Sequence, residues 1–224
     1  MEIKRLHPWG IGVPEAIKLQ NELAGLVVTQ GDIGTPGTVA GVDVAVSGKY
    51  GLAAVVVLSY PELEPVETAV AGGRLEFPYV PGLLSFREIP LALDAFRKLQ
   101  HHPDLVMVDG QGYAHPRRIG LASHLGLALD RPTVGCAKSR LCGEHDEPGQ
   151  AAGAVSWLRD NGETIGAAVR TRRGVKPLYV SAGHMTSLAS AIHWVVSCCR
   201  GYRCPEPTRL AHLAARANLT PVMT

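Results

Sequence analysis

Two apolar runs rich in valine, residues 38–46 and 52–58, lie close together near the start of the chain. Uninterrupted stretches of this kind favour β-strands. The five residues between them include Gly48 and Gly51 and are typical of a hairpin turn. The pattern predicts two adjacent antiparallel strands, and residues 67–75 make a plausible third strand after them.

The remainder of the chain alternates between helical and strand patterns. Residues 105–108 form a short apolar run, which is typical of a parallel strand covered on both faces. Apolar residues at helical spacing predict helices over residues 14–31, 84–99, 116–129, 184–199 and 207–218. Short apolar runs predict further strands over residues 133–137, 152–157, 165–171 and 178–181.

Three strands followed by helix, strand, helix and strand predict an α/β fold, in which a mixed β-sheet is flanked by helices. The same order of elements is found in the ribonuclease H-like architecture, and this link is an analogy at the level of the fold. Hydrophobic residues make up 46% of the 224 residues, so the chain can bury a sizeable core. We expect one domain over residues 1–224.

Charge is divided unevenly along the chain, although the net charge is only +2. Residues 1–112 carry 8 basic and 13 acidic side chains, whereas residues 113–224 carry 14 basic and 7 acidic ones. The first half can supply carboxylates for a cation, and the second can supply partners for phosphate. Chance clustering of solvated charges gives the same pattern, so the imbalance alone decides nothing.

No feature of the sequence directs it into a membrane or out of the cytosol. The first ten residues lack the apolar core and cleavage site of a secretory signal. Residues 177–199 are uncharged and long enough to span a bilayer, but their proline, serine, threonine and histidine residues make them too polar. We expect a cytoplasmic protein, with a monomer as the default state.

Asp43 is the only charged residue in the apolar run 38–46. If that strand is central, the carboxylate loses hydration worth roughly several kcal/mol. It then needs a proton, a basic partner or a cation. An aspartate at a strand edge, facing water or an arginine, is the alternative interpretation.

Asp109 and Glu88 are the other two carboxylates of interest. Asp109 ends the run 105–108, outside the carboxyl end of a strand, where α/β proteins place ligands, although Asp109-Gly110 also fits a simple turn. Glu88 ends a Ser-x-x-Glu pattern, and spacing alone favours a helix capping box. Three carboxylates on separate elements could converge on one or two Mg²⁺ ions and hydrolyse a phosphodiester, but spacing cannot show convergence.

Five short segments occur in an order that resembles the endonuclease V family. They are residues 39–43 (VAGVD), 78–88 (PYVPGLLSFRE), 108–112 (VDGQG), 115–118 (HPRR) and 205–209 (PEPTR). The resemblance covers nearly the whole chain, and the PYVPG and HPRR stretches are its most specific parts. It implies a nuclease that nicks a strand near deaminated purines, above all deoxyinosine.

The resemblance implies that Asp43, Glu88 and Asp109 form the catalytic site for Mg²⁺, for which Mn²⁺ could substitute. The capping role of Glu88 then loses priority. His212 would act near the attacking water as ligand, base or orienting group, whereas a lone helical histidine is more often a surface or packed residue. Lys138 follows the predicted strand 133–137 and would bind phosphate or stabilise charge in the transition state.

The resemblance also implies contacts to the nucleic acid. Tyr79 would press into the duplex as a wedge where the damaged base leaves the stack, unless it merely packs under a proline loop. Three glycines would let backbone approach a flipped hypoxanthine, although singly they would mean only turns. Arg117 and Arg118 would hold phosphate at a helix start, for which a solvated basic turn is the alternative. These glycines are Gly82, Gly110 and Gly112. His115 and His184 are expected neighbours of the site, with a polar residue satisfied within the protein as the alternative for each.

The predicted reaction is hydrolysis of the second phosphodiester bond 3′ to deoxyinosine, which leaves 3′-hydroxyl and 5′-phosphate ends and keeps the base. The closest alternative is an inosine-specific ribonuclease, since the 2′-hydroxyl of RNA could be read at the site. Two further alternatives remain open. One is a non-catalytic protein that binds deaminated nucleic acid, and the other is a ribonuclease H-like recombination or transposition nuclease.

Overall fold

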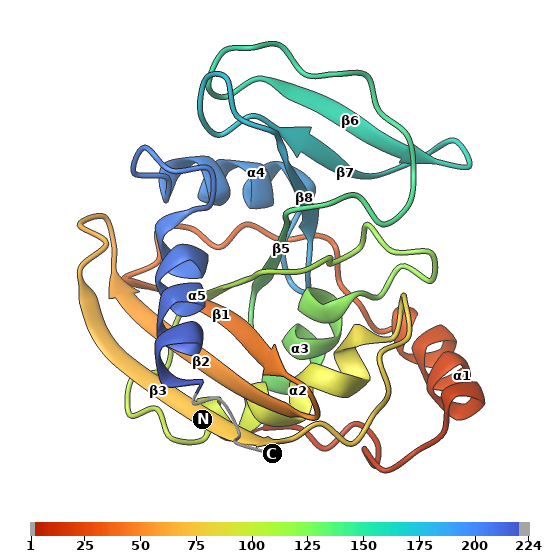
Figure 1. The fold of residues 1–224 in the computed structure, drawn as a ribbon. Coiled ribbons are helices and arrows are strands. Elements are labelled where there is room, and N and C mark those ends of the chain that lie inside the picture. Colours follow the sequence, from red (N-terminus) through yellow and green to blue (C-terminus); the bar gives the residue numbers. More distant parts are fainter. Residues whose placement is uncertain (1–2, 220–224) are drawn as a thin grey trace.

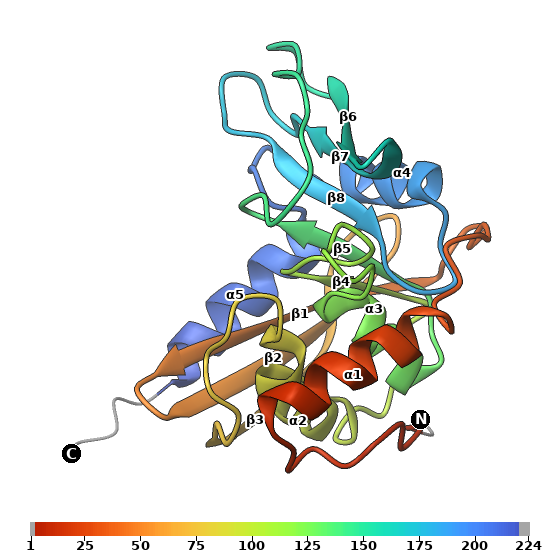
Figure 2. The ribbon, with the colours of Figure 1, turned by 90° about the vertical axis from the view of Figure 1, so that its right-hand side faces the viewer.

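The computed structural model describes residues 3–219, which form an eight-stranded mixed sheet with helices on both faces (Figures 1 and 2). The strands are β1 (Thr38–Ser47), β2 (Tyr50–Ser59), β3 (Pro65–Arg74), β4 (Leu105–Val108), β5 (Thr133–Ala137), β6 (Val155–Asp160), β7 (Glu163–Val169) and β8 (Leu178–Ala182). The helices are α1 (Val13–Ala24), α2 (Leu84–Phe96), α3 (Leu121–Leu129), α4 (Leu188–Ser197) and α5 (Glu206–Asn218).

The structure confirms the predicted α/β fold, in which a mixed sheet is flanked by helices. Its strand order is β3-β2-β1-β4-β5-β8-β7-β6. The expected single domain also includes residues 1–2 and 220–224, which lie outside the described residues. Within residues 3–219, no helix is long and apolar enough to cross a bilayer.

The three central strands β1, β4 and β5 run parallel, whereas the outer strands pair antiparallel. β1 and β2 form the predicted hairpin, in which Ser47 pairs with Tyr50. β4 is short and fully buried, as expected for a strand covered on both faces. Because the central strands are parallel, their carboxyl ends meet at one edge of the sheet. Residues that end or follow these strands therefore come together there.

Alternate residues of the central strands enter two separate hydrophobic cores. Ala40 and Val106 pack on one face under α2 and α3. Val39 and Met107 pack on the other face under α4 and α5. Figure 2 shows α5 on one side of the strands β1, β2 and β3, and α1, α2 and α3 on the other side. Burial of both faces explains why these strands are almost uniformly apolar.

Two predicted helix starts are wrong. The third helix was expected from Pro116, but it begins at Leu121, because residues before it form a turn in which Arg118 adopts φ 57°. The fourth was expected from His184 and begins at Leu188, where the Ser187 side chain accepts a hydrogen bond from the Ser190 amide at 3.1 Å.

The predicted capping box at Glu88 is also absent. The N-cap of α2 is Leu83, and Ser85 lies inside the helix. The Ser85 hydroxyl instead lies 3.1 Å from Nδ1 of the buried His124. Glu88 is thereby free of the structural role that spacing alone favoured.

Gly41 allows α5 to cross β1 at backbone contact distance. A Cβ atom added there would lie 1.9 Å from the Pro207 carbonyl oxygen. We expect Gly41→Ala to lower the free energy of unfolding by about 1–3 kcal/mol, because α5 must shift to relieve this overlap. Chemical denaturation measures the change. Gly10→Ala is the matched control, since a Cβ at Gly10 meets nothing within 4 Å; equal effects of the two substitutions would contradict this account.

A buried pair of histidines ties the N-terminal segment to the body of the protein. His124 Nε2 lies 2.8 Å from His7 Nε2, and His7 Nδ1 lies 2.8 Å from the Pro8 carbonyl oxygen. Complete burial, with the neighbouring His7, lowers the pKa of His124 to about 3. A histidine with a lowered folded pKa contributes stability that is present above pH 6.5 and is lost as the pH falls toward the folded value.

The pH dependence of this histidine pair is tested by comparing the wild type with a variant that lacks the titrating His124 ring. Between pH 7 and pH 5, the free energy of unfolding of the wild type should fall relative to that of His124→Asn by about 2 kcal/mol, since asparagine does not titrate. Denaturant titrations in EDTA at both pH values give the difference. A gap between the two proteins that stays constant with pH would refute the assignment.

Candidate active site

Asp43, Asp109 and His212 come together at the carboxyl edge of the parallel strands. One ligand atom from each lies within 4.8 Å of the others, and all three residues are half-buried. Asp43 lies on β1, Asp109 directly follows β4, and His212 projects from α5. His212 Nδ1 and Asp43 Oδ2 are 2.7 Å apart. Three elements distant in sequence thus build one polar cluster.

Lys138 adds a cation to this cluster. It follows β5, and its ammonium group forms an ion pair with Asp109 Oδ2. Burial acts to lower the pKa of Lys138, but the bond to Asp109 outweighs it and raises the pKa. Burial raises the pKa of Asp109, and Lys138 opposes that rise. The lysine is therefore charged and lies beside a partly desolvated carboxylate.

Glu88 reaches the same place from α2, on the other face of the sheet. It lines a small cavity together with Asp43 and Asp109. Burial, and then the charges of these two aspartates, raise the pKa of Glu88 to about 8. Glu88 lies outside the group of three whose ligand atoms are within 4.8 Å. The three carboxylates predicted from the sequence therefore lie near one another. The three residues whose ligand atoms lie closest together, however, are Asp43, Asp109 and His212.

These residues fit a divalent cation. Carboxylate oxygens and a histidine nitrogen are suitable donors, and Glu88 would add another oxygen once ionised. Burial is the main cause of the raised pKa of Glu88, and repulsion from Asp43 and Asp109 adds to it; a bound cation would offset that repulsion. A divalent cation bound there would polarise a phosphodiester and lower the pKa of an attacking water.

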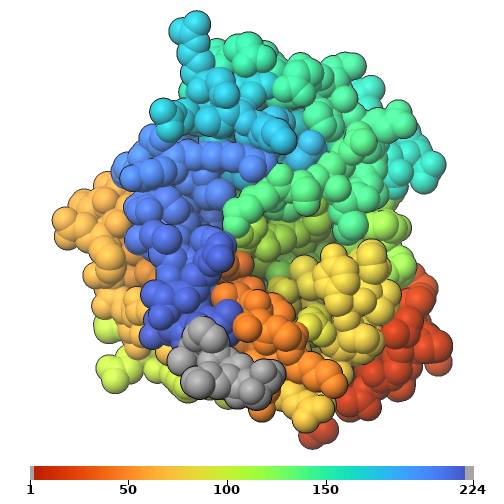
Figure 3. All heavy atoms as spheres, viewed as in Figure 1, coloured from red at the N-terminus to blue at the C-terminus, as the bar shows by residue number. Residues whose placement is uncertain are grey.

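A cavity of about 270 Å³ opens beside the cluster. Figure 3 shows a hollow on this face, bordered by α5, the end of β1, the loop before α2 and the segment after β5. The cavity is lined by residues from four segments, among them Tyr79, Gly82, Asp109, Gly110, Gln111, His115, Gly120, Lys138, Ser139 and Arg140. Tyr79 is 71% exposed, which excludes the interpretation that it packs under the loop.

Gly82 shapes this cavity through its backbone. It adopts φ 79°, and its carbonyl oxygen accepts hydrogen bonds from Gln20 Nε2 at 3.0 Å and Arg117 Nη2 at 3.0 Å. His115 Nε2 lies 2.9 Å from the same oxygen. Burial lowers the pKa of His115 to about 4, so this ring is neutral at pH 7. His115 is a neighbour of the site, as expected from the sequence.

Gly112 and His184 lie away from the cavity. The Gly112 amide donates to Ser181 Oγ at 2.9 Å, and its carbonyl accepts from the Gly120 amide at 2.9 Å, so neither backbone group is available to a base. His184 contacts Thr133, at the amino end of β5. That is the opposite edge of the sheet from Asp109, because β4 and β5 are parallel.

Arg117 and Arg118 precede α3 and are engaged within the protein. Arg117 Nε donates to Gln20 Oε1 at 2.6 Å. Arg118 pairs with Asp160 at 2.9 Å and with Glu163 at 2.7 Å. Because α3 begins at Leu121, the predicted placement of the two arginines at a helix start is wrong, and the charge of Arg118 is offset by two carboxylates.

Several residues of the cavity escaped sequence reasoning. The first backbone positions of α2 and α3 line it, including Leu84, Ser85 and Leu121. Neither helix has a side-chain cap at its N-terminus. Gln111 lines the cavity as well; its Nε2 donates to the Ser139 carbonyl at 2.8 Å, and its buried Oε1 has no partner within residues 3–219. The position of Gln111 between the motif glycines Gly110 and Gly112 is the sequence feature that could have identified it as a cavity residue.

The family model for endonuclease V matches residues 21–213, which is most of the chain. The chain belongs to the endonuclease V family. The assignment made from the five motifs is thereby confirmed. Among curated relatives, an endonuclease V from Dehalococcoides mccartyi is 53% identical over 217 residues, covering 96% of this chain and 97% of the relative.

Solved structures of endonuclease V share the fold. The endonuclease V of Streptomyces avermitilis is 42% identical with a TM-score of 0.90, covering 94% of each chain. The endonuclease V of Ciona intestinalis, in complex with a 24mer DNA containing an inosine followed by a ribo-adenosine, is 28% identical with a TM-score of 0.81. That match covers 92% of this chain and 97% of the Ciona chain. Family membership makes the chain a nuclease.

Proposed function

We propose that this nuclease repairs DNA in the cytoplasm by hydrolysing the second phosphodiester bond 3′ to deoxyinosine, leaving 3′-hydroxyl and 5′-phosphate ends. The observation that carries the proposal is the position of the cluster of Asp43, Asp109 and His212 directly beside a cavity large enough for a base. The inosine-containing DNA bound to the Ciona relative supports the same substrate class. Mg²⁺ is the proposed cofactor, and Mn²⁺ should substitute for it.

Each polar residue has a task that its position allows. Asp43, Asp109 and Glu88 hold the cation. His212, whose Nδ1 is oriented by Asp43, can accept a proton from water through its other ring nitrogen. Lys138 lies where it can stabilise negative charge on the phosphate in the transition state.

The cavity offers hydrogen-bond donors to a flipped hypoxanthine. Leu84, Ser85 and Leu121 line the cavity at the starts of α2 and α3, and neither helix has a side-chain cap, so their amides can donate to acceptors on a purine edge. Gly82 and Gly110 line the same cavity and let the base approach the backbone. Gly82 tolerates no larger residue without strain, because of its positive φ.

Tyr79 is the proposed wedge. We expect Tyr79→Ala to slow nicking of double-stranded deoxyinosine DNA by about tenfold or more, because stacking of an aromatic ring is worth roughly 1–3 kcal/mol per base. Single-stranded substrate should lose less, since no partner strand has to be separated. Single-turnover rates on both substrates give the comparison. Equal losses on the two substrates would assign Tyr79 to general binding.

The preference for DNA over RNA is tested directly with matched strands. The ribo-adenosine after the inosine in the Ciona complex shows that a ribonucleotide can be bound beside the lesion by that relative. We expect faster nicking of a deoxyinosine DNA strand than of the same RNA sequence with one inosine. Faster nicking of the RNA would favour an inosine-specific ribonuclease.

A further inference from the structure

A second hollow, of about 560 Å³, adjoins the base-sized cavity along residues 138–140, which line both. We call it the basic groove and define it by Lys138, Arg140, Lys176 and Arg203, which line it. The groove adjoins the active site, because Lys138 also borders the base-sized cavity and the solvent-facing hollow that contains Asp43 and His212. Arg140 is likewise shared with the base-sized cavity.

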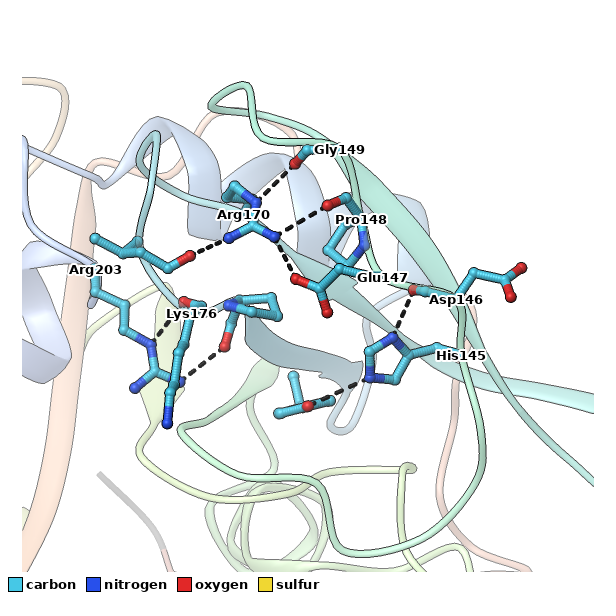
Figure 4. Close-up of polar contacts among 11 residues, drawn as sticks. His145, Asp146, Glu147, Pro148, Gly149, Arg170, Lys176 and Arg203 are labelled. Atoms are coloured by element: carbon cyan, nitrogen blue, oxygen red, sulfur yellow. Dashed lines mark hydrogen bonds and ion pairs between the residues drawn. The ribbon is translucent and has the colours of Figure 1, made fainter.

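The charge of the basic groove is unbalanced. Within residues 3–219, neither Arg140 nor Lys176 has a carboxylate oxygen within 4.0 Å, and both are exposed. Glu147 also lines the groove, but its Oε1 accepts a hydrogen bond from Arg170 Nη2 at 2.5 Å. Figure 4 shows the Lys176 side chain extending away from the backbone, and no dashed line joins its ammonium group to another residue drawn there. A concave surface of this kind attracts anions.

Two arginines fix the walls of the groove. Arg203 donates from Nε to the Lys176 carbonyl at 2.9 Å and from Nη2 to the Lys138 and Pro177 carbonyls at 2.6 and 2.8 Å. It therefore joins the end of β5 to the loop before β8, while its Nη1 makes no hydrogen bond within the described residues. The side chain of Arg170 is 4% exposed and holds the opposite wall through the Gly149 and Pro148 carbonyls at 2.7 and 3.0 Å (Figure 4).

The two motif arginines, Arg117 and Arg118, do not line the basic groove. Arg118 is paired with two carboxylates, and Arg117 is bonded to Gln20 and Gly82. A strand whose phosphodiester lies at Asp109 must leave the active site along some charged surface. The basic groove is continuous with Lys138, which contacts Asp109 itself.

We propose that the basic groove binds successive backbone phosphates of the substrate strand on one side of the scissile bond. Arg140 and Lys176 contact the phosphates, and Lys138 links this path to the carboxylates. The inference rests on the proposed function only in taking nucleic acid as the substrate. Contacts of this type position the strand and carry no base specificity.

The salt dependence of binding tests the groove. Affinity for a single-stranded oligonucleotide with one deoxyinosine is measured by fluorescence anisotropy, in EDTA so that cleavage does not intervene, across a series of salt concentrations. For Arg140→Ala/Lys176→Ala we expect about tenfold weaker binding at low salt and a log–log salt slope smaller by roughly 1.4, or 0.7 for each lost phosphate contact.

Arg97→Ala/Arg131→Ala is the matched control, because it removes two positive charges at the opposite edge of the sheet, after α2 and α3. Equal slopes for the two double variants would overturn the groove. If the groove variant shows the expected smaller slope but the wild type does not nick deoxyinosine DNA in Mg²⁺, the proposed function is refuted and the groove remains supported. If the wild type nicks this DNA but the groove variant has the same slope as the wild type, the groove is refuted and the proposed function remains supported.

Discussion

Asp109→Asn is expected to slow the nicking of deoxyinosine DNA in Mg²⁺ by at least about 1,000-fold. Asp109 belongs to the group that could hold the cation, and it also pairs with Lys138. Asparagine keeps the shape of the side chain and removes its charge, so the site loses a cation ligand while the fold is preserved. Single-turnover rates with excess protein measure the chemical step without interference from product release.

Asp94→Asn is the control for this substitution. Asp94 lies on α2, where it is exposed, and its only ion pair within residues 3–219 is with Arg97 on the surface. We expect its nicking rate to stay within about twofold of wild type, as surface ion pairs contribute little. If Asp109→Asn retained a rate within about tenfold of wild type, the cluster would not be the catalytic centre.

Glu88→Gln is expected to change stability and activity in opposite directions. Glu88 has a folded pKa of about 8, above the ordinary value of 4.5, because it is buried beside two aspartates. A raised folded pKa gives stability that is present below pH 4.5 and is lost as the pH rises toward 8. Glutamine cannot ionise, so in EDTA at pH 8 the variant should be more stable by about 4 kcal/mol.

Activity should fall in the same variant by about 1,000-fold, since a cation ligand is lost. Mg²⁺ should also raise the melting temperature of the wild type more than that of Glu88→Gln, because the cation stabilises the ionised glutamate. Thermal unfolding with and without Mg²⁺ measures this difference. Glu22→Gln, at an exposed position on α1, controls for the loss of one negative charge. Lower stability of Glu88→Gln in EDTA would contradict the account.

Sequence patterns predicted the central strands β4 and β5 well and the edge strand β6 poorly. β4 and β5 are buried on both faces, so every residue in them is under the same apolar constraint. β6 lies at the edge of the sheet, and Leu158 is its only buried residue. The hydrophobic signal there is weak, which explains why the strand was predicted over residues 152–157 and begins at Val155.

The part of the site that lies near the carboxyl ends of the parallel strands could be predicted from the sequence. Asp109 and Lys138 directly follow β4 and β5, and Asp43 lies on β1 one residue beyond its last pair with β4, so the parallel pairing alone brings the three together. His212 required the family resemblance, because its position depends on α5 crossing β1 at Gly41, far away in sequence. The pairing of Arg118 with Glu163 is equally remote from any local pattern.

Cleavage of end-labelled duplexes, identical except for a single deoxyinosine, tests the central claim most directly. Products are mapped at nucleotide resolution for the wild type in Mg²⁺ and in EDTA. The account predicts one nick at the second phosphodiester 3′ to deoxyinosine in Mg²⁺, with 3′-hydroxyl and 5′-phosphate ends, and no nick in EDTA or in the unmodified duplex. Cutting that is independent of deoxyinosine, or no cutting in Mg²⁺, would contradict it.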